Sequence, residues 1–556
     1  MNGKKDSWID VNALSNEDVN KSGFSREELS LLAQHVTNPL GNVFCVTNLP
    51  GITGPIFARY SRAQGGFREI LTKEFLKEGK INAKKADNLI ARVLVAYGDD
   101  SVGELEGTHL ALEQISNLAT KIVEDCRIGG SPIEQSTRYV FYDQKDREGK
   151  FKYLREKKIM ASPHAQHYTE TMDFLFQTYC DLIKPLQEHF TKLKPLQEAE
   201  YNIKGTGNLK LKDLQESKDI DAFKRTYDTD IRTKACDTTR TILPASTLTN
   251  VGLYGNGRFY QGLLTKLFTD TLTEPNELAN LTRTELDKTM PQFIKRAKTD
   301  EYSREREYNM HKLAQEILKG IHPEKESPVV LLDNQPNLIN IAAECLFKYS
   351  QHPTQQIRNI ISNLPPQKTR EIIHTYNGPR KTRRDRPGIA LEFGYPLTFD
   401  LLGDFGIYRD LQRHRMLTQE RQELTPYLGF FIPQEIIDAG LTHKITLCKE
   451  KSIQLYEALH KDFPKEAQYA VLFGFNIRFR MGMNFREAMH MWELRTTPQG
   501  HPNYRKMCQH MHNAIKQKHP EMAELLTYVD HNEYFWSRAD SEAKQRRKEQ
   551  ELDNKD

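Results

Sequence analysis

The stretch Tyr408-Arg409-Asp410-Leu411-Gln412-Arg413-His414-Arg415 closes an apolar segment that begins at Leu397. The apolar residues predict a buried element that leads into a helix, and the end of that helix carries two guanidiniums around one imidazole. Consecutive helical residues point in different directions, so Arg413 and Arg415 could hold different parts of one anionic ligand while His414 faces a third group. A solvated basic helix end has the same local sequence, so other parts of the chain must decide between the two.

Length and composition limit the classes of protein to which the chain can belong. Its 556 residues suffice for two or three domains, and 79 basic against 75 acidic residues leave a formal net charge of +4. This balance gives no overall field that attracts nucleic acid, so an anion site depends on local clusters. Seven scattered cysteines without a Cys-x-x-Cys pair favour a reducing compartment over disulfides or structural zinc. No apolar run has the length of a signal peptide or a membrane span, so we expect a cytoplasmic protein.

Short segments recur along the chain at nearly constant offsets. Segments 57–62, 104–107 and 126–128 are echoed at 346–351, 391–394 and 413–415, which gives offsets of 287 to 289 residues. Asn256-Gly-Arg258 pairs with Asn484-Phe-Arg486 at the shorter offset of 228, as an insertion confined to the first copy would produce.

The repeat predicts a domain organisation. We expect a polar, loosely docked arm (1–30), a first copy (31–325) with a charged insertion at about 143–235, a second copy (328–536) and a charged tail (537–556).

In the first copy, the segment Glu134-Gln135-Ser136-Thr137-Arg138-Tyr139 follows a pair of glycines. If the segment is extended, Glu134, Ser136 and Arg138 project from one face. A hydroxyl and a guanidinium on that face can hold a phosphate, and the carboxylate can accept from a neutral heterocycle. An ordinary strand with a polar outer face is the alternative.

Arg-His-Arg, seven further residues and a Ser, with Glu-x-Ser-x-Arg-Tyr at the end, resembles the signature of flavin-dependent thymidylate synthases. Both copies resemble this family, and neither has the whole signature. The first copy keeps Glu134–Tyr139 but has Cys126–Ile128 at the Arg-His-Arg position. The second keeps Arg413–Arg415 but has Glu423 and Thr425 at the Ser and Arg positions.

The downstream part of the signature divides in the same way. The family places an Arg sixteen residues before an Asn-x-Arg that starts a helix, and another Arg eleven residues after that Asn. The first copy has the early Arg240 but Leu267 at the late position, whereas the second has Gln468 early and Arg495 late.

The resemblance implies that these losses are complementary. The family is a homotetramer with nucleotide sites between subunits, each site taking one set of residues from either subunit. Here each copy keeps the set of residues that the other lacks. Together the two copies complete one site, and the reciprocal site, which takes the substituted positions from both copies, is expected to be inactive. We therefore expect a homodimer of fused chains that forms a pseudo-tetramer. The implied fold class is α+β, with two tandem domains, each of helices around a small antiparallel sheet, and a helical insertion in the first copy.

The implied activity is conversion of dUMP to dTMP, with methylenetetrahydrofolate as carbon donor and FAD reduced by NADPH. Arg495 would be catalytic, because it would stabilise negative charge at the imide nitrogen of the uracil. The residues expected to bind dUMP are Glu134, Gln135, Ser136, Thr137, Arg138, Arg240, Arg413 and Arg495. The residues expected to contact FAD are Ser101, Glu134, Arg413, His414, Arg415, Asn484, Arg486 and His490.

Two further positions depart from the family. Asp99 replaces the usual His of the turn that contains Ser101 and Glu104, which puts the role of that turn in doubt. Asp410 replaces a Gln three residues before Arg-His-Arg, and a carboxylate there would repel a phosphate.

No metal site is expected from the sequence. Cys508, His510 and His512 have the residue types of zinc ligands, but on a helix His510 does not share the face of the other two.

Two other functions stay open at this stage. One is a flavin- or nucleotide-binding regulatory protein without turnover. The other is an RNA-acting relative that uses the basic loop at 380–386, although the insertion is mixed in charge rather than basic, which makes nucleic acid an unlikely partner.

Overall fold

The computed structural model describes residues 9–47, 49, 52–60, 65–77, 80–81, 100–126, 128–205, 207–305, 308, 312, 325, 327–332, 338–347, 354–377, 389–392 and 397–536. In that part of the chain, no helix is both long and apolar enough to span a membrane. The chain forms two compact units, one from residues 1–113, 122–134 and 250–320 and the other from 114–121, 135–249 and 321–556. Their boundaries differ from those predicted for the repeats, because the second unit contains segments of both copies.

The first unit contains most of a three-stranded sheet with strand order β3-β7-β4. The strands are β3 (Gly107–Ser116), β4 (Gly130–Glu134) and β7 (Leu248–Asn256), and β4 and β7 are antiparallel. The principal helices of this unit are α1 (Asn16–Ser22), α2 (Arg26–Leu32), α3 (Thr53–Tyr60), α10 (Gly257–Thr269) and α11 (Thr273–Leu286). Helix α6 (Asn117–Glu124) follows β3 and crosses the boundary between the units.

The predicted loose arm at 1–30 is instead partly helical. Ser15 and Ser25 cap α1 and α2, and Ser25 forms a capping box with Glu28. Leu29 is fully buried, so apolar packing holds this segment in place.

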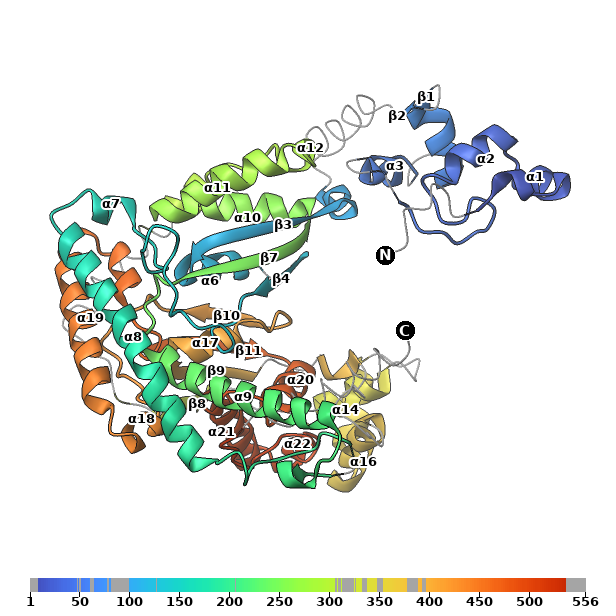
Figure 1. Ribbon diagram of the computed structural model, residues 1–556. Coiled ribbons are helices and arrows are strands. Elements are labelled where there is room, and N and C mark those ends of the chain that lie inside the picture. Colours follow the sequence, from blue (N-terminus) through green and yellow to red (C-terminus); the bar gives the residue numbers. More distant parts are fainter. Residues whose placement is uncertain are drawn as a thin grey trace. The chain divides into compact units, whose positions relative to one another are not determined.

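The second unit contains a four-stranded antiparallel sheet with strand order β10-β11-β9-β8 (Figure 1). The strands are β8 (Val329–Leu331), β9 (Leu397–Asp404), β10 (Thr418–Arg421) and β11 (Asn476–Met483). Residues of β9 alternate between buried and half-buried, as expected for a strand with one face on the core. The principal helices are α8 (Ala165–Leu193), α9 (Ser217–Thr239), α14 (Leu338–Phe347), α15 (Thr354–Ser362), α16 (Pro366–Asn377), α17 (Phe405–Leu411), α19 (Thr442–Asp462), α20 (Phe485–Arg495) and α21 (Pro502–Lys518).

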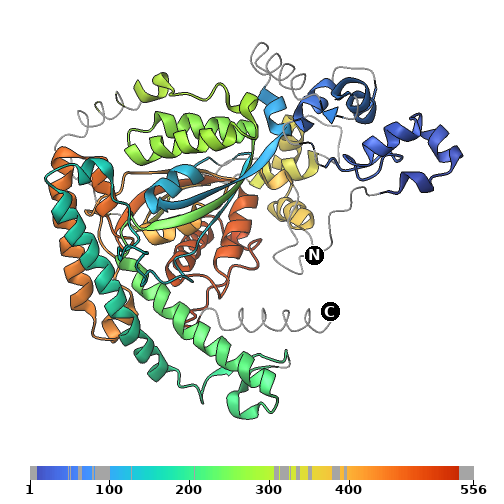
Figure 2. The ribbon, with the colours of Figure 1, turned by 45° about the horizontal axis from the view of Figure 1, so that its top comes forward.

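The predicted insertion is largely helical. Its longest helix is α8, which packs against α9 and α19 (Figures 1 and 2). The predicted end at residue 235 lies inside α9, because that helix continues without a break to Thr239.

The order of elements occurs twice. The sequence strand, helix, strand, long helix, strand, helix describes β3, α6, β4, α9, β7 and α10, and equally β9, α17, β10, α19, β11 and α20, when the additional elements between β4 and α9 and the short helix between β10 and α19 are set aside. Each set of three strands has the same order, with the last strand in the middle. Asn256 and Asn484, which the offset of 228 relates, are the N-caps of α10 and α20.

Backbone hydrogen bonds between segments 241–246 and 469–474 are related in pairs by this same offset. The amide of Ala245 donates to Val471 at 2.8 Å, and the amide of Phe473 donates to Leu243 at 2.9 Å. The offset of 228 relates Ala245 to Phe473 and Leu243 to Val471, so each bond is the counterpart of the other when the two copies are exchanged. Such reciprocity marks an isologous contact around a local two-fold axis, which supports the predicted repeat.

Candidate active site

The ring of Tyr504 lies against guanidiniums from both repeats. The Arg138 guanidinium carbon is 5.8 Å from the ring centre and that of Arg495 is 5.6 Å from it. Arg138 also donates from Nη1 to the Tyr504 hydroxyl at 3.3 Å. All three residues belong to the second unit, so the fold brings together Arg138 and Arg495, which are 357 positions apart. Stacking of guanidiniums on a phenol favours this arrangement.

Arg138 is buried and paired with Asp237 on α9. Its Nε and Nη2 donate to the two carboxylate oxygens at 2.7 and 2.6 Å, the bidentate geometry that arginine favours. Burial by itself would raise the pKa of Asp237, but the charge and hydrogen bonds of Arg138 outweigh burial and hold that pKa below its usual value. The guanidinium thus has a carboxylate counterion of its own.

Arg240, at the end of α9, lies beside Asp410 of α17. Its Nη1 and Nη2 are 3.4 and 3.5 Å from one oxygen of Asp410, and both side chains are largely buried. Burial opposes ionisation of Asp410, yet Arg240 first and then Arg413 lower its pKa below the usual range. The expected repulsion of a phosphate by Asp410 is therefore reduced by an arginine that shares its charge.

A second buried carboxylate, Asp404, lies near this pair. It caps α17 by accepting from the amide of Ile407 at 3.0 Å, and it accepts from Asn503 at 3.0 Å. Burial raises the pKa of Asp404 despite the nearby Arg240.

The segment Glu134–Tyr139 is not extended throughout, so the condition for placing alternate side chains of the segment on one strand face is not met. Strand β4 ends at Glu134, and a turn follows in which the amides of Tyr139 and Val140 donate to the carbonyl of Ser136. The Ser136 hydroxyl accepts from the Arg138 amide at 3.3 Å, which is the local bond by which serine favours turns over strands. Ser136 stays half-buried, while Arg138 is buried.

The neighbours of Ser136 have their own contacts. Thr137 is buried, and its hydroxyl accepts from Arg409 of the second repeat at 3.2 Å. The Gln135 carbonyl accepts from the Thr249 hydroxyl at 3.4 Å.

Arg413–Arg415 lie outside the helix on which we expected them. Helix α17 ends at Leu411, and the carbonyl of Gln412 accepts from the Gln419 side chain instead of from a further helical amide. In the loop that follows, Arg413 and Arg415 are exposed and His414 between them is buried.

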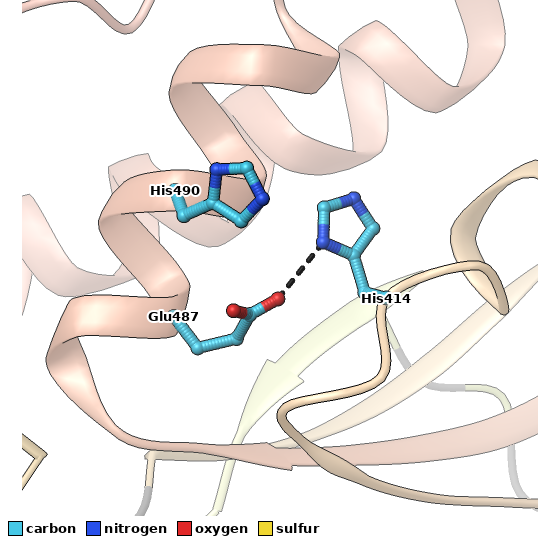
Figure 3. A group of neighbouring side chains, drawn as sticks. All are labelled: His414, Glu487 and His490. Atoms are coloured by element: carbon cyan, nitrogen blue, oxygen red, sulfur yellow. Dashed lines mark hydrogen bonds and ion pairs between the residues drawn. The ribbon is translucent and has the colours of Figure 1, made fainter. Parts of the chain in front are cut away.

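His414 is held between Glu487 and Arg495. Figure 3 shows its ring with Glu487 and the neighbouring His490. Nδ1 of His414 is 2.8 Å from Oε1 of Glu487, and its Nε2 is 2.9 Å from Nε of Arg495. The rings of His414 and His490 are 5.5 Å apart. In the described part of the chain, His414, Glu487 and His490 form a group whose atoms could hold a metal ion.

The expected FAD residues of α20 lie at its start and along its first turns. Asn484 caps the helix by accepting from the Glu487 amide at 2.9 Å, and Arg486 is half-buried in the first turn. His490 follows one turn later.

The remaining expected FAD residues belong to the first unit. Glu134 is buried at the end of β4, and Ser101 lies in a 3-10 helix (Asp100–Leu105). Glu104 of that helix forms an exposed ion pair with Arg258 at 2.5 Å. Asp99 and the basic loop at 380–386 lie outside the described residues.

The residues that replace the family signature, and that we expected to line the inactive reciprocal site, include Gln468, Glu423 and Leu267. The Gln468 side chain accepts from the amide of Leu424 at 3.0 Å, and Glu423 forms an ion pair with Lys465. Leu267 is fully buried in α10.

Sequence reasoning missed Asp237, Glu487 and Tyr504. Asp237 lies three residues before Arg240, and Glu487 three residues after the capping Asn484, so both are neighbours of expected site residues on one helical face. Tyr504 lies nine residues after Arg495 and belongs to none of the motifs described above.

The side chains of Cys508, His510 and His512 have different surroundings. Cys508 is fully buried and His510 is exposed, while His512 Nδ1 lies 2.8 Å from Nε2 of His531.

Comparison with protein families matches the chain in two segments, one within each predicted copy. The profile of the family described as thymidylate synthase complementing protein matches residues 56–292 and 380–521. A protein of Chlamydia muridarum, described as UPF0159 protein, is 37% identical over 551 residues, covering 95% of this chain and all of the relative. One of Thermoplasma acidophilum is 30% identical over 500 residues, covering 88% of this chain and 98% of the relative. A crystal structure of a UMP/dUMP methylase from Streptomyces cacaoi, bound with 5-Br dUMP, aligns over 37% of this chain and 96% of its own, with 16% identity and a TM-score of 0.30.

Proposed function

Because the chain belongs to the thymidylate synthase complementing protein family, we propose that it converts dUMP to dTMP at one composite site built from both repeats. One observation carries the proposal. The ring of Tyr504 contacts Arg138, from the set that only the first copy keeps, and Arg495, from the set that only the second keeps. Decay without selection has no reason to retain complementary residues that meet in the folded chain.

In the proposed site, Ser136, Arg138 and Arg240 bind the phosphate and base of dUMP, with Gln135 and Thr137 beside them and Arg413 from the other repeat. Arg138 is paired with Asp237, and Arg240 lies 3.4 Å from Asp410; these contacts would orient the donors before the ligand arrives. Glu134 would accept a hydrogen bond from the ligand.

Arg495 is the proposed catalytic residue. A fixed guanidinium next to the imide of uracil stabilises the negative charge that develops as C5 becomes nucleophilic. In the proposed reaction dUMP, methylenetetrahydrofolate, NADPH and one proton yield dTMP, tetrahydrofolate and NADP⁺. The C5 hydrogen leaves as a proton.

The second repeat has the donor types that suit the diphosphate of FAD. Exposed Arg413 and Arg415 offer guanidiniums, and the start of α20, with Asn484 and Arg486, offers backbone amides at a helix N-terminus. FAD would carry the hydride from NADPH. Both ring nitrogens of His414 have protein partners, so a contact of His414 with flavin would use the ring face. Ser101 and His490 complete the proposed set.

We extend the proposal to the assembly and location. Two chains would form a pseudo-tetramer with two live sites, in the cytoplasm.

The test is release of tritium from C5-labelled dUMP with NADPH, methylenetetrahydrofolate and the purified, yellow protein. We expect Ser136→Ala and Arg495→Ala to lower the rate by at least about a hundredfold, the scale of a lost electrostatic contact. Glu423→Ala is the control. It changes a residue of the site that is expected to be inactive, so it should keep the wild-type rate. Full activity of Arg495→Ala would overturn the site assignment, and binding of FAD and dUMP without tritium release would favour the regulatory alternative.

A further inference from the structure

The imidazole of His414 has a hydrogen-bond partner at each ring nitrogen, and Figure 3 shows the one at Glu487. Nδ1 lies 2.8 Å from Glu487 Oε1, and Nε2 lies 2.9 Å from Arg495 Nε. The side chains of His414 and Glu487 are only 4% and 7% exposed, so water does not replace these partners easily.

The chemistry of the partners fixes the position of the imidazole proton. The Nε–H of an arginine can only donate, so Nε2 of His414 must accept and carries no hydrogen. The neutral ring then has its proton on Nδ1, where it donates to the Glu487 carboxylate. Glu487, His414 and Arg495 thereby form a directed chain in which each residue orients the next.

The same chain opposes a metal ion at His414, Glu487 and His490. An ion on Nδ1 would move the ring proton to Nε2, where it would face the Nε–H of Arg495, donor against donor at 2.9 Å. An ion on Nε2 would displace Arg495 and lose the Glu487 oxygen on the opposite side of the ring. The cluster can ligate a metal only after Arg495 has left.

Arg495 is constrained on two sides. Its Nε is held by His414, and its guanidinium lies over the Tyr504 ring. The terminal nitrogens Nη1 and Nη2 of Arg495 take no part in the hydrogen bond to His414.

We infer that Glu487 and His414 are positioning residues, which hold Arg495 in its working orientation by fixing the tautomer of His414. The inference rests on the proposed function of Arg495. It also gives the buried histidine a role other than acid, base or metal ligand.

The first test compares two replacements of His414 in the tritium-release assay. A Gln amide can put its carbonyl near the place of Nε2 and accept from Arg495, whereas the shorter Asn reaches only the place of Nδ1. We expect His414→Gln to retain at least about tenfold more kcat than His414→Asn, with similar KM for dUMP, because only orientation in the transition state is lost. His510→Gln, at an exposed position of α21, is the control and should match the wild type. Equal loss in both His414 variants would overturn the inference.

Glu487→Leu removes the acceptor that keeps the proton on Nδ1. We expect it to lower kcat by about ten- to a hundredfold at nearly unchanged KM, and Glu487→Gln, whose carbonyl can still accept from Nδ1, to recover most of the rate. An unchanged kcat in Glu487→Leu would contradict the inference.

A second readout does not depend on activity. In protein with ¹⁵N-labelled histidine, the His414 signals are identified by their loss in His414→Gln. They should show a protonated Nδ1 and a bare Nε2, and addition of Zn²⁺ should not shift them. A protonated Nε2, or one equivalent of Zn²⁺ bound in a way that His490→Ala abolishes, would overturn the inference even if the protein forms no dTMP.

Discussion

Pro244 and Leu472 face each other in an antiparallel bridge, and the offset of 228 makes each the counterpart of the other. A residue that pairs with its own counterpart lies on the local two-fold axis. The bonds on either side obey the same relation, since Ser246 donates to Tyr469 and Gly474 donates to Thr241. The two repeats therefore meet through equivalent backbone, although their side chains have diverged.

Gly474→Ala should destabilise the protein. A Cβ at Gly474 would lie 2.3 Å from the Thr241 hydroxyl and 2.7 Å from the Phe430 ring, so the contact at the two-fold axis must open. We expect a loss of about 1–3 kcal/mol in the free energy of unfolding, measured by urea titration.

The control is Gly262→Ala in α10, where a Cβ would have no neighbour within 4 Å. Removing a helical glycine should stabilise by up to about 1 kcal/mol. Gly474→Ala as stable as the wild type would show that the backbone contact is looser than described.

Asp410→Gln should lower the stability of the protein and increase its affinity for dUMP. The substitution restores the residue type of the family signature and removes the carboxylate beside Arg240. Because a buried guanidinium loses its counterion, we expect the free energy of unfolding to fall by about 3 kcal/mol. We expect dUMP to bind about tenfold more tightly, measured by calorimetry, because a negative charge near its phosphate is gone.

Asp438→Asn is the matched control, since it removes an exposed carboxylate at the end of α18 (Gln434–Asp438). It should change neither quantity. Weaker dUMP binding in Asp410→Gln would show that Asp410 orients Arg240 more than it repels phosphate.

The two capping asparagines should separate stability from activity. Asn256→Ala and Asn484→Ala each remove a side chain that accepts from the amide three residues later, and each should cost about 1 kcal/mol of stability. Only α20 carries Glu487 and Arg495, so tritium release should fall mainly in Asn484→Ala. Equal losses of activity in the two variants would contradict the proposal of one active composite site per chain.

His501 should make the protein less stable in mild acid. It is buried and caps α21 by accepting at Nδ1 from the Asn503 amide at 3.2 Å. Burial, and then the charge of Arg240, lower the pKa of His501 well below its usual value. Below a pH of about 6.5 the unfolded chain takes up a proton that the folded chain refuses, so stability falls by up to about 1.4 kcal/mol per pH unit.

His501→Asn keeps a capping acceptor that does not titrate. The slope of unfolding free energy against pH, measured between about pH 6.5 and 5, should therefore decrease by about one proton. An unchanged slope would assign the acid sensitivity to other groups.

The sequence alone determined the repeat, its two offsets and the complementary retention of Arg138, Arg240, Arg413 and Arg495. These are properties of residue identity and spacing, which do not depend on packing. The helix starts at Asn256 and Asn484 could also be predicted from the sequence, because an N-cap is a local interaction.

Only the tertiary structure decided how those residues are paired. Asp237, Glu487 and Tyr504 act on arginines through contacts that no local spacing specifies, as when Tyr504 meets Arg138 across 366 positions. The turn at Ser136 contains a side-chain hydrogen bond that no strand pattern reveals, and the prediction of Arg413 on a helix was wrong because α17 ends at Leu411. The tautomer of His414 also depends on the tertiary structure. The position of the proton on an imidazole is set by the donors and acceptors around the ring, and only folding brings Glu487 and Arg495 to it.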